Sequence, residues 1–176
     1  MKRLAVLTCV LSLVAVGCDK SINPVVPSGV VNMMAQLSGA SNVPPAGSLE
    51  AGATGSLQLT MTPTTGGDFT ASFTLQLAGL VRSGVLPAPL DNGSVIVAGL
   101  IHQGAAGALG APVFQLPISL TAPILTPTST ALLTLRGITI PAATANAIIA
   151  NPAGFYFNLY SALNQNGVLR GQLVRQ

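Results

Sequence analysis

The chain contains one histidine, His102, and this side chain is the first candidate for chemistry at neutral pH. It ends a strand-like run and precedes a glycine-rich segment, a position at which many proteins place ligand-binding residues. A zinc or copper site usually needs three or four protein ligands. The chain offers a single imidazole, and its carboxylates are scattered along the sequence. His102 is therefore only a weak metal candidate, and we expect a structural histidine and no bound cofactor.

Groups for nucleophilic or acid–base catalysis are equally sparse. A serine nucleophile needs a neighbouring base, and the chain has no GxSxG-type setting for one. Glycoside hydrolysis needs two facing carboxylates, and Asp68 and Asp91 meet only if folding brings them together. The sequence therefore predicts that the protein is not an enzyme.

Arg170 lies in a run that otherwise has the pattern of a half-buried strand. A buried guanidinium must be paired or hydrogen-bonded. Because polar partners are few, we expect Arg170 to hold strand ends together by donating to backbone carbonyls, with Asn158 as a further partner across the hairpin. In the alternative, Arg170, Asn158 and His102 form one polar pocket that recognises a ligand.

Two runs around a turn form a predicted β-hairpin near the C-terminal end, with the sequence FYFNLYSALNQNGVLRGQL. In Phe155–Ser161, Phe, Phe and Leu alternate with Tyr, Asn and Tyr, which is the period of a half-buried strand. The dipeptide Asn166-Gly167 accepts a positive φ and favours a tight turn into Gly167–Val174.

Short strands separated by glycine- and proline-containing turns are predicted along the rest of the chain, and one helix is predicted at Pro141–Ala150, which stops at Asn151-Pro152. The other strand candidates are Val31–Leu37, Thr54–Thr62, Asp68–Leu77, Ser94–His102, Pro112–Ser119 and Thr130–Ile138. This pattern predicts an all-β, antiparallel, Greek-key-like β-sandwich or barrel of about eight strands. The segments VLPAPLDNG and GAAGALGAP are expected to be loops.

Only 6% of the residues are charged, and the mean hydropathy is +0.65. The arginines are scattered and form no basic stripe, so nucleic acid is excluded as an expected partner. The chain has no Trp and only two Tyr, which disfavours a membrane barrel with aromatic girdles.

The first 17 residues have the pattern of an export signal, with Lys2-Arg3 before the apolar run Leu4–Val16. The run ends in Ala-Val-Gly-Cys, which resembles a bacterial lipobox with Cys18 as the lipidated residue. Cys9, the other cysteine, lies inside the signal. Residues 18–30 then form a lipidated cysteine and flexible tether. We expect an exported protein, anchored by lipid in the cell membrane or outer membrane, with residues 31–176 as its domain.

Three stretches together resemble the CHRD (chordin) domain family. The C-terminal hairpin is similar to the closing motif, in which the Arg-Gly-Gln of residues 170–172 is the most regular feature. AQLSGASNVPPAGSLEAGATGSLQLTM (residues 35–61) is similar to the opening motif L-S-G-x-x-E-V-P-P. GLIHQGAAGALGAPVFQLP (residues 99–117) is similar to the central motif H-I-H-x-G-x-x-G. The resemblance spans most of residues 31–175.

The chain departs from the family pattern at the positions that would build a metal site. Leu100 occupies the first histidine position of the central motif, and Tyr160 occupies that of the closing motif. Asn42 stands where the opening motif usually has Glu. Only His102 remains of this polar set. The resemblance therefore adds Tyr160 to the candidate polar site of His102, Asn158 and Arg170.

Three hypotheses of function follow. The first is a non-enzymatic, lipid-anchored CHRD module of the cell envelope that binds a protein or a polysaccharide. The second is a zinc or copper site that uses His102 on a sandwich resembling copper–zinc superoxide dismutase. The third is a structural envelope protein that self-associates through its apolar strands, for which a long edge strand without charge would be suited. The scarcity of catalytic and metal-binding groups favours the first.

Overall fold

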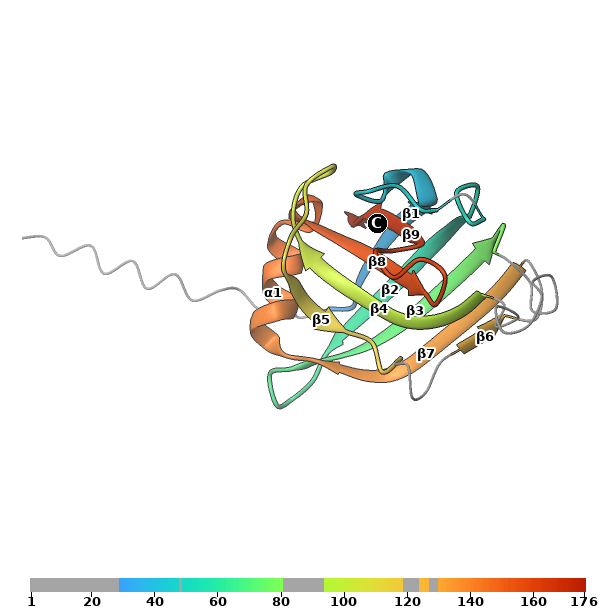
Figure 1. Cartoon of the computed structure of the whole chain (residues 1–176). Coiled ribbons are helices and arrows are strands. Elements are labelled where there is room, and N and C mark those ends of the chain that lie inside the picture. Colours follow the sequence, from blue (N-terminus) through green and yellow to red (C-terminus); the bar gives the residue numbers. More distant parts are fainter. Residues whose placement is uncertain (1–28, 48, 81–93, 119–123, 127–129) are drawn as a thin grey trace, which may run out of the picture.

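The computed structural model describes residues 29–47, 49–80, 94–118, 124–126 and 130–176. Within these ranges the strands are β1 Val31–Ser38, β2 Thr54–Pro63, β3 Phe69–Ala78, β4 Ser94–Gln103, β5 Pro112–Gln115, β6 Ile124–Thr126, β7 Thr130–Ile140, β8 Phe155–Ser161, β9 Leu169–Gln172 and β10 Val174–Arg175. All described pairs are antiparallel. The sheet curls into a nearly closed barrel (Figure 1). This confirms the predicted all-β fold.

Neighbouring strands follow the order β5-β4-β8-β9-β1-β2-β3-β7, while β10 pairs with β1 and β6 pairs with β4. Strands β1, β2 and β3 form a meander, because consecutive strands of the chain pair with one another. A longer loop that contains the 3₁₀ turn η1 (Gly39–Ser41) joins β1 to β2, and a short turn joins β2 to β3. The chain then crosses from β3 to β4 and later from β7 back to β8, which inserts β8 between β4 and β9. These two crossings give the Greek-key-like connectivity and make β8 a central strand.

The β2–β3 hairpin shows how local sequence sets the register. Alternation of apolar and polar residues places one face of each strand in the core, and ten residue pairs run without a shift from Thr54↔Ala78 to Pro63↔Phe69. The predicted turn closes through hydrogen bonds from Thr64 N to Asp68 O at 2.8 Å and from Gly67 N to Thr64 O at 3.1 Å. Gly67 has a φ of +92°, which glycine adopts without strain.

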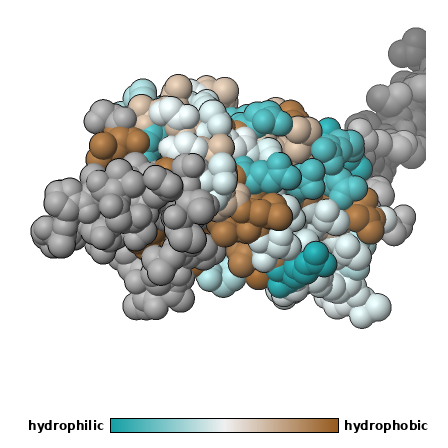
Figure 2. Space-filling model, turned by 90° about the vertical axis from the view of Figure 1, so that its right-hand side faces the viewer, coloured by the Kyte–Doolittle hydropathy of each residue, from teal (hydrophilic) through white to brown (hydrophobic). Residues whose placement is uncertain are grey.

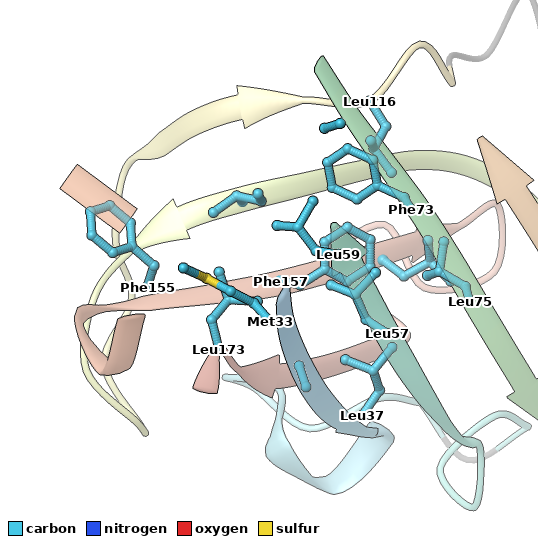
Figure 3. Close-up of a cluster of buried hydrophobic side chains, with 14 of the residues drawn as sticks. Met33, Leu37, Leu57, Leu59, Phe73, Leu75, Leu116, Phe155, Phe157 and Leu173 are labelled. Carbon is cyan, nitrogen blue, oxygen red and sulfur yellow. The ribbon is translucent and has the colours of Figure 1, made fainter. Parts of the chain in front are cut away.

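The core fills the barrel with aromatic, Leu, Ile and Met side chains from nearly all strands (Figure 3). Phe73, Phe157, Leu57 and Leu59 are fully buried. The rings of Phe73 on β3 and Phe114 on β5 stack at 6.2 Å. This contact links β5, at one end of the strand order, to β3, which lies next to the other end. A few large rings therefore lock a core otherwise built from aliphatic residues.

One short α-helix, α1 (Ala142–Ala150), lies beside the barrel (Figure 1) and buries Ala145, Ile148 and Ile149. Pro141 is its N-cap residue, and Asn151 ends it by donating its backbone N–H to Ala147 O. The helix begins one residue after the predicted start, because Pro141 is the N-cap, and it ends at the predicted Ala150 before Asn-Pro. The described residues also form two 3₁₀ turns, η1 (Gly39–Ser41) and η2 (Pro152–Gly154).

Some elements differ from the prediction. The strand predicted at Pro112–Ser119 ends at Gln115, and the short strand β6 was not predicted. The predicted run Gly167–Val174 divides at Leu173, because β9 pairs with β8 while β10 pairs with β1. The signal, Cys18, the tether up to residue 28 and the whole segment VLPAPLDNG lie outside the described residues.

On the face shown in Figure 2, hydrophobic and hydrophilic residues of the described surface are interspersed. The large hydrophobic side chains that are exposed lie at separate places in the chain, namely Val30, Leu49, Leu109, Leu132 and Val174. Among the described residues, no helix reaches the length and apolar character needed to cross a bilayer.

Candidate functional site

The candidate polar residues gather on the outward face of the β4-β8-β9 sheet. Period-two alternation turns Phe157 and Leu159 of β8 into the core and sends Tyr156, Asn158 and Tyr160 to the other side. His102 of β4 stands opposite Tyr156, and Arg170 of β9 stands opposite Asn158. The register thus brings together His102, Asn158, Tyr160 and Arg170, and it adds Tyr156 at their centre.

Tyr156 is the middle layer of a stack. The imidazole of His102 lies parallel to its ring, with centroids 4.9 Å apart and an interplanar angle of 3°. The guanidinium carbon of Arg170 lies 3.5 Å from the centroid of the same ring, within the range of a cation–π contact. Since β4 and β9 flank β8 on opposite sides, Tyr156 separates the two basic side chains.

These side chains hold the glycine-rich loop, residues 104–111, against the sheet. Arg170 Nη2 donates to Ala105 O at 3.1 Å and to Ala108 O at 2.7 Å. The backbone N–H of Gly110 donates to Tyr156 Oη at 3.1 Å, and His102 Nδ1 contacts Gly110 O at 2.9 Å. Arg170 therefore does donate to carbonyls, but to those of a loop and not to strand ends.

Gln172 fixes the base of the same loop. Its Nε2 lies 2.8 Å from Gly104 O, 2.6 Å from Ala153 O and 2.8 Å from Phe155 O. The Gly104 N–H also donates to Gly154 O at 2.8 Å, so the loop is tied to η2 as well. The small residues of the loop allow it to lie this close, since a Cβ on Gly110 would collide with Gln103 O.

The hydrogen bonds define the tautomer of His102. A carbonyl only accepts, so Nδ1 carries the proton that is donated to Gly110 O. Nε2 is then an acceptor, and Tyr160 Oη donates to it at 2.9 Å. Burial is the main cause that lowers the pKa of His102, and the positive charge of Arg170 acts in the same direction against the hydrogen bond to Gly110. The imidazole is therefore neutral at pH 7.

Burial also raises the pKa of Tyr160 above its usual value, although a hydrogen bond from Asn158 opposes this. Tyr160 thus keeps its proton. It accepts a hydrogen bond from Asn158 and donates one to His102. This chain of hydrogen bonds ends at the Gly110 carbonyl. Every described link is a neutral donor on a neutral acceptor, so the network orients side chains and holds no mobile charge.

The polar face continues into a tight contact under the β8–β9 turn. Asn42 and Asn158 are 3% and 6% exposed, and both approach Gly167. A Cβ at this glycine would lie 2.5 Å from Asn42 Oδ1 and 2.7 Å from Asn158 Nδ2. Its φ is +118°, so the turn needs glycine for both backbone and space.

A second polar cluster, which the sequence did not reveal, surrounds Glu50. This carboxylate is fully buried and accepts hydrogen bonds at 2.6 Å from both Ser161 Oγ and Asn164 Nδ2. Asn164 Oδ1 in turn accepts from Gly47 N at 2.6 Å. The cluster ties the loop after η1 to the end of β8, and its geometry is that of a structural anchor.

A cavity of about 340 Å³ opens between the η1 loop and the glycine-rich loop. Its floor is Gln36 of β1 with Arg170, Gly171 and Gln172 of β9, and its walls are residues 40–43 and 106–107. Arg170 therefore belongs both to the polar stack and to this cavity. Both loops lie at the top of the view in Figure 1.

A metal site on His102 meets a geometric obstacle, because both ring nitrogens already have hydrogen-bond partners. Within the described ranges, no group of three or more His, Cys, Asp or Glu side chains could hold a metal ion. Leu100, at the position of the first motif histidine, stands opposite Asn158 on β8. The described ligands therefore do not fit zinc or copper.

Of the predicted site residues, the structure brings His102, Asn158, Tyr160 and Arg170 into one cluster, while Cys18 lies outside the described residues. Tyr156 was missed, although it alternates in phase with Asn158 and Tyr160 and the same pattern could have identified it. Gln172 was missed as a loop anchor, although it lies two residues after Arg170 on the same face.

The family model of the CHRD domain matches residues 33–173. The chain belongs to the CHRD domain family. The match begins within β1 and extends beyond the end of β9, so the polar stack, the glycine-rich loop and the cavity are all parts of the CHRD domain. Neither the curated proteins nor the solved structures gave a match to this chain.

Proposed function

We propose that this CHRD domain is a non-enzymatic binding module that is anchored by lipid to the cell envelope. The family supports a module without catalysis of its own. The anchor is inferred from the export signal and from Cys18, which follows Ala-Val-Gly. The partner is a protein or a polysaccharide of the envelope, bound by the surface around the glycine-rich loop.

The engagement of His102 is the observation that carries the proposal. A general base must have a lone pair within hydrogen-bond reach of the substrate proton that it abstracts. The Nε2 lone pair of His102 accepts from Tyr160, and Nδ1–H is donated to Gly110 O. Arg170 and Tyr156 hold the same loop. These polar side chains thus build a rigid platform, and a binding surface needs such preorganisation.

The low charge of the chain also supports a partner recognised by contact and hydrogen bonds rather than by long-range attraction. From Cys18 onward the sequence has five basic and four acidic residues. Such a surface does not steer charged polymers in general. It leaves recognition to local features, of which the cavity beside Arg170 is the most defined.

Lipidation is tested by growing cells with an alkyne-labelled fatty acid and detecting label on the protein. We expect label on the native chain and on Cys9→Ala, because Cys9 lies in the part that is removed. Cys18→Ala should carry none and should leave the membrane fraction. Equal labelling of the two variants would refute the anchor.

Binding is tested by incubating the detergent-purified full chain with envelope polysaccharide and, separately, with envelope proteins, followed by sedimentation. Retention by one of the two supports a binding module. Analytical ultracentrifugation of the chain alone addresses the competing hypothesis of self-association. Oligomers that grow with concentration, together with no retention in either mixture, would replace the proposal with a self-associating structural protein.

A further inference from the structure

We propose that the cavity between the η1 loop and the glycine-rich loop binds an acidic sugar, a hydroxylated ring that carries one carboxylate. This inference rests on the proposed binding function and names the ligand class of that surface. It depends on three features: the charge of Arg170, the neutral polar lining and the size of the opening.

The charge of Arg170 is not neutralised by a described carboxylate. The residue is 3% exposed, and its hydrogen bonds within the described ranges go to the carbonyls of Ala105 and Ala108. Both bonds leave from Nη2, so the N–H groups of Nη1 and Nε take no part in them. The face of the guanidinium lies on Tyr156. A buried cation without a counter-ion is costly, and an anion at its remaining donors offsets that cost.

The lining favours a carboxylate over a phosphate. Sites for phosphate usually combine several cations or the N-terminus of a helix. Here Arg170 is the one charged residue among the residues that line the cavity. One guanidinium matches one carboxylate in charge and in planar shape.

The remaining lining suits hydroxyl groups. Gln36 and Ser41 are exposed side chains at the floor and wall, and each offers both donors and acceptors. Small residues, Ala40 and Ala106, leave room between them. A volume of about 340 Å³ lies at the lower end of the roughly 300–1,000 Å³ of small-molecule sites, which fits one sugar residue and not a folded partner.

The test compares glucuronate with glucose, which differ only at C6, where the first has a carboxylate and the second a hydroxymethyl group. Binding to the full chain in neutral detergent is measured by calorimetry. We expect glucuronate to bind at least about tenfold more tightly than glucose, because the charge-assisted hydrogen bonds are lost with the neutral sugar. Equal affinities, or no binding of glucuronate, would overturn the inference.

A matched set of variants locates the site without removing Arg170. Ala106→Glu places a carboxylate at the cavity wall and should weaken glucuronate binding at least about tenfold by repulsion and competition. Ala106→Gln has the same size without the charge, and Leu109→Glu puts the same charge on a residue of this loop that does not line the cavity. Both controls should bind within about threefold of the native chain. If Leu109→Glu weakens binding as much as Ala106→Glu does, the site lies elsewhere.

Arg170→Lys keeps the charge but loses the planar fork, and circular dichroism shows whether it folds. The folded variant should lose most of the preference for glucuronate over glucose. Retained preference would contradict the role of the guanidinium.

Sedimentation with envelope polysaccharide separates the two proposals. If Ala106→Glu is retained as well as the native chain, the binding module stands and the acidic-sugar site fails.

Discussion

The outward face of β1-β2-β3 and the outward face of β4-β8-β9 belong to one sheet but differ in the solvent exposure of their polar side chains. On the first, polar side chains are exposed or half-buried, among them Asn32, Gln36, Gln58, Thr70 and Gln76. On the second, Tyr156, Asn158 and Arg170 are at least nine-tenths buried. The difference is the glycine-rich loop, which lies over the second face and leaves the first uncovered.

This comparison shows what a loop needs in order to cover a polar face. Its own carbonyls and N–H groups must find partners when water is excluded. Arg170, Gln172 and Tyr156 supply donors and an acceptor at the places where the loop needs them. The covered polar side chains thus contribute to stability as the ordinary core residues do on the inner face. Substitutions should therefore cost much on this outward face and little on the other.

Tyr156→Ala should have the largest effect. The ring is 1% exposed and contacts both His102 and Arg170, so its removal should lower the free energy of unfolding by about 3–5 kcal/mol, as for a core aromatic. Gln58→Ala, on the exposed face, should change it by less than about 0.5 kcal/mol. Urea denaturation measures both. Similar costs at the two positions would remove the contrast between the faces.

Arg170→Met should cost about 2–4 kcal/mol, because the carbonyls of Ala105 and Ala108 lose a charged donor. Hydrogen exchange should increase in residues 104–111, whose attachment depends on this side chain. Arg175→Met is the control, since Arg175 is exposed on β10, and it should stay within about 0.5 kcal/mol. A loop that exchanges at the native rate in Arg170→Met would show that other contacts hold it.

Gly167→Ala should cost about 1–3 kcal/mol, since the new Cβ meets Asn42 and Asn158 and the positive φ disfavours alanine. Gly52→Ala makes the same change at a glycine where no atom lies within 4 Å of the added Cβ, and it should leave stability nearly unchanged. Thermal unfolding distinguishes them. A native melting temperature for Gly167→Ala would mean that the turn moves freely away from the covered face.

His102 should give the smallest effect, a dependence of stability on pH. Its folded-state pKa lies below the value of about 6.5 of an unfolded chain, because burial opposes protonation. The unfolded chain therefore binds the proton more readily. The contribution of neutral His102 to stability is complete above about pH 6.5 and decreases as the pH falls below it.

Urea denaturation at pH 7 and pH 5.5 measures this slope. His102→Gln should unfold more easily at both values but should lose the part of the slope that comes from the imidazole. The chain has no second histidine to obscure the result. An unchanged slope in the variant would assign the pH dependence to carboxylates.

The sequence predicted most elements of the fold because each carries its own local signal. Alternation over Phe69–Ala78 and Phe155–Ser161, the turn at Asn166-Gly167 and the proline before α1 are readable without any partner. The division of the predicted strand Gly167–Val174 at Leu173 was not predicted, because it depends on which neighbouring strand each half pairs with. Strand β6, with three residues, is too short to carry a pattern.

The candidate site was predicted in its members but not in its organisation. Register follows from the hairpin, so Asn158 opposite Arg170 could be expected. The acceptors of Arg170 lie 62 and 65 residues away, in a segment of Gly and Ala that carries no side-chain signal. The buried Glu50 was equally hidden, because its donors Ser161 and Asn164 are more than 100 residues away. Tertiary contacts, not local propensities, decided both.

The direction of β1 has a consequence for how the domain is displayed. The strand begins at Val31, where the chain arrives from its N-terminal side, and it runs straight into η1 at the cavity wall. Eight extended residues measure roughly 26 Å. A domain held by its N-terminus therefore carries the mouth between the two loops at the far end of its first strand, away from the point where the chain enters the domain. The same geometry recommends attachment through the N-terminus when the protein is fixed to a sensor surface.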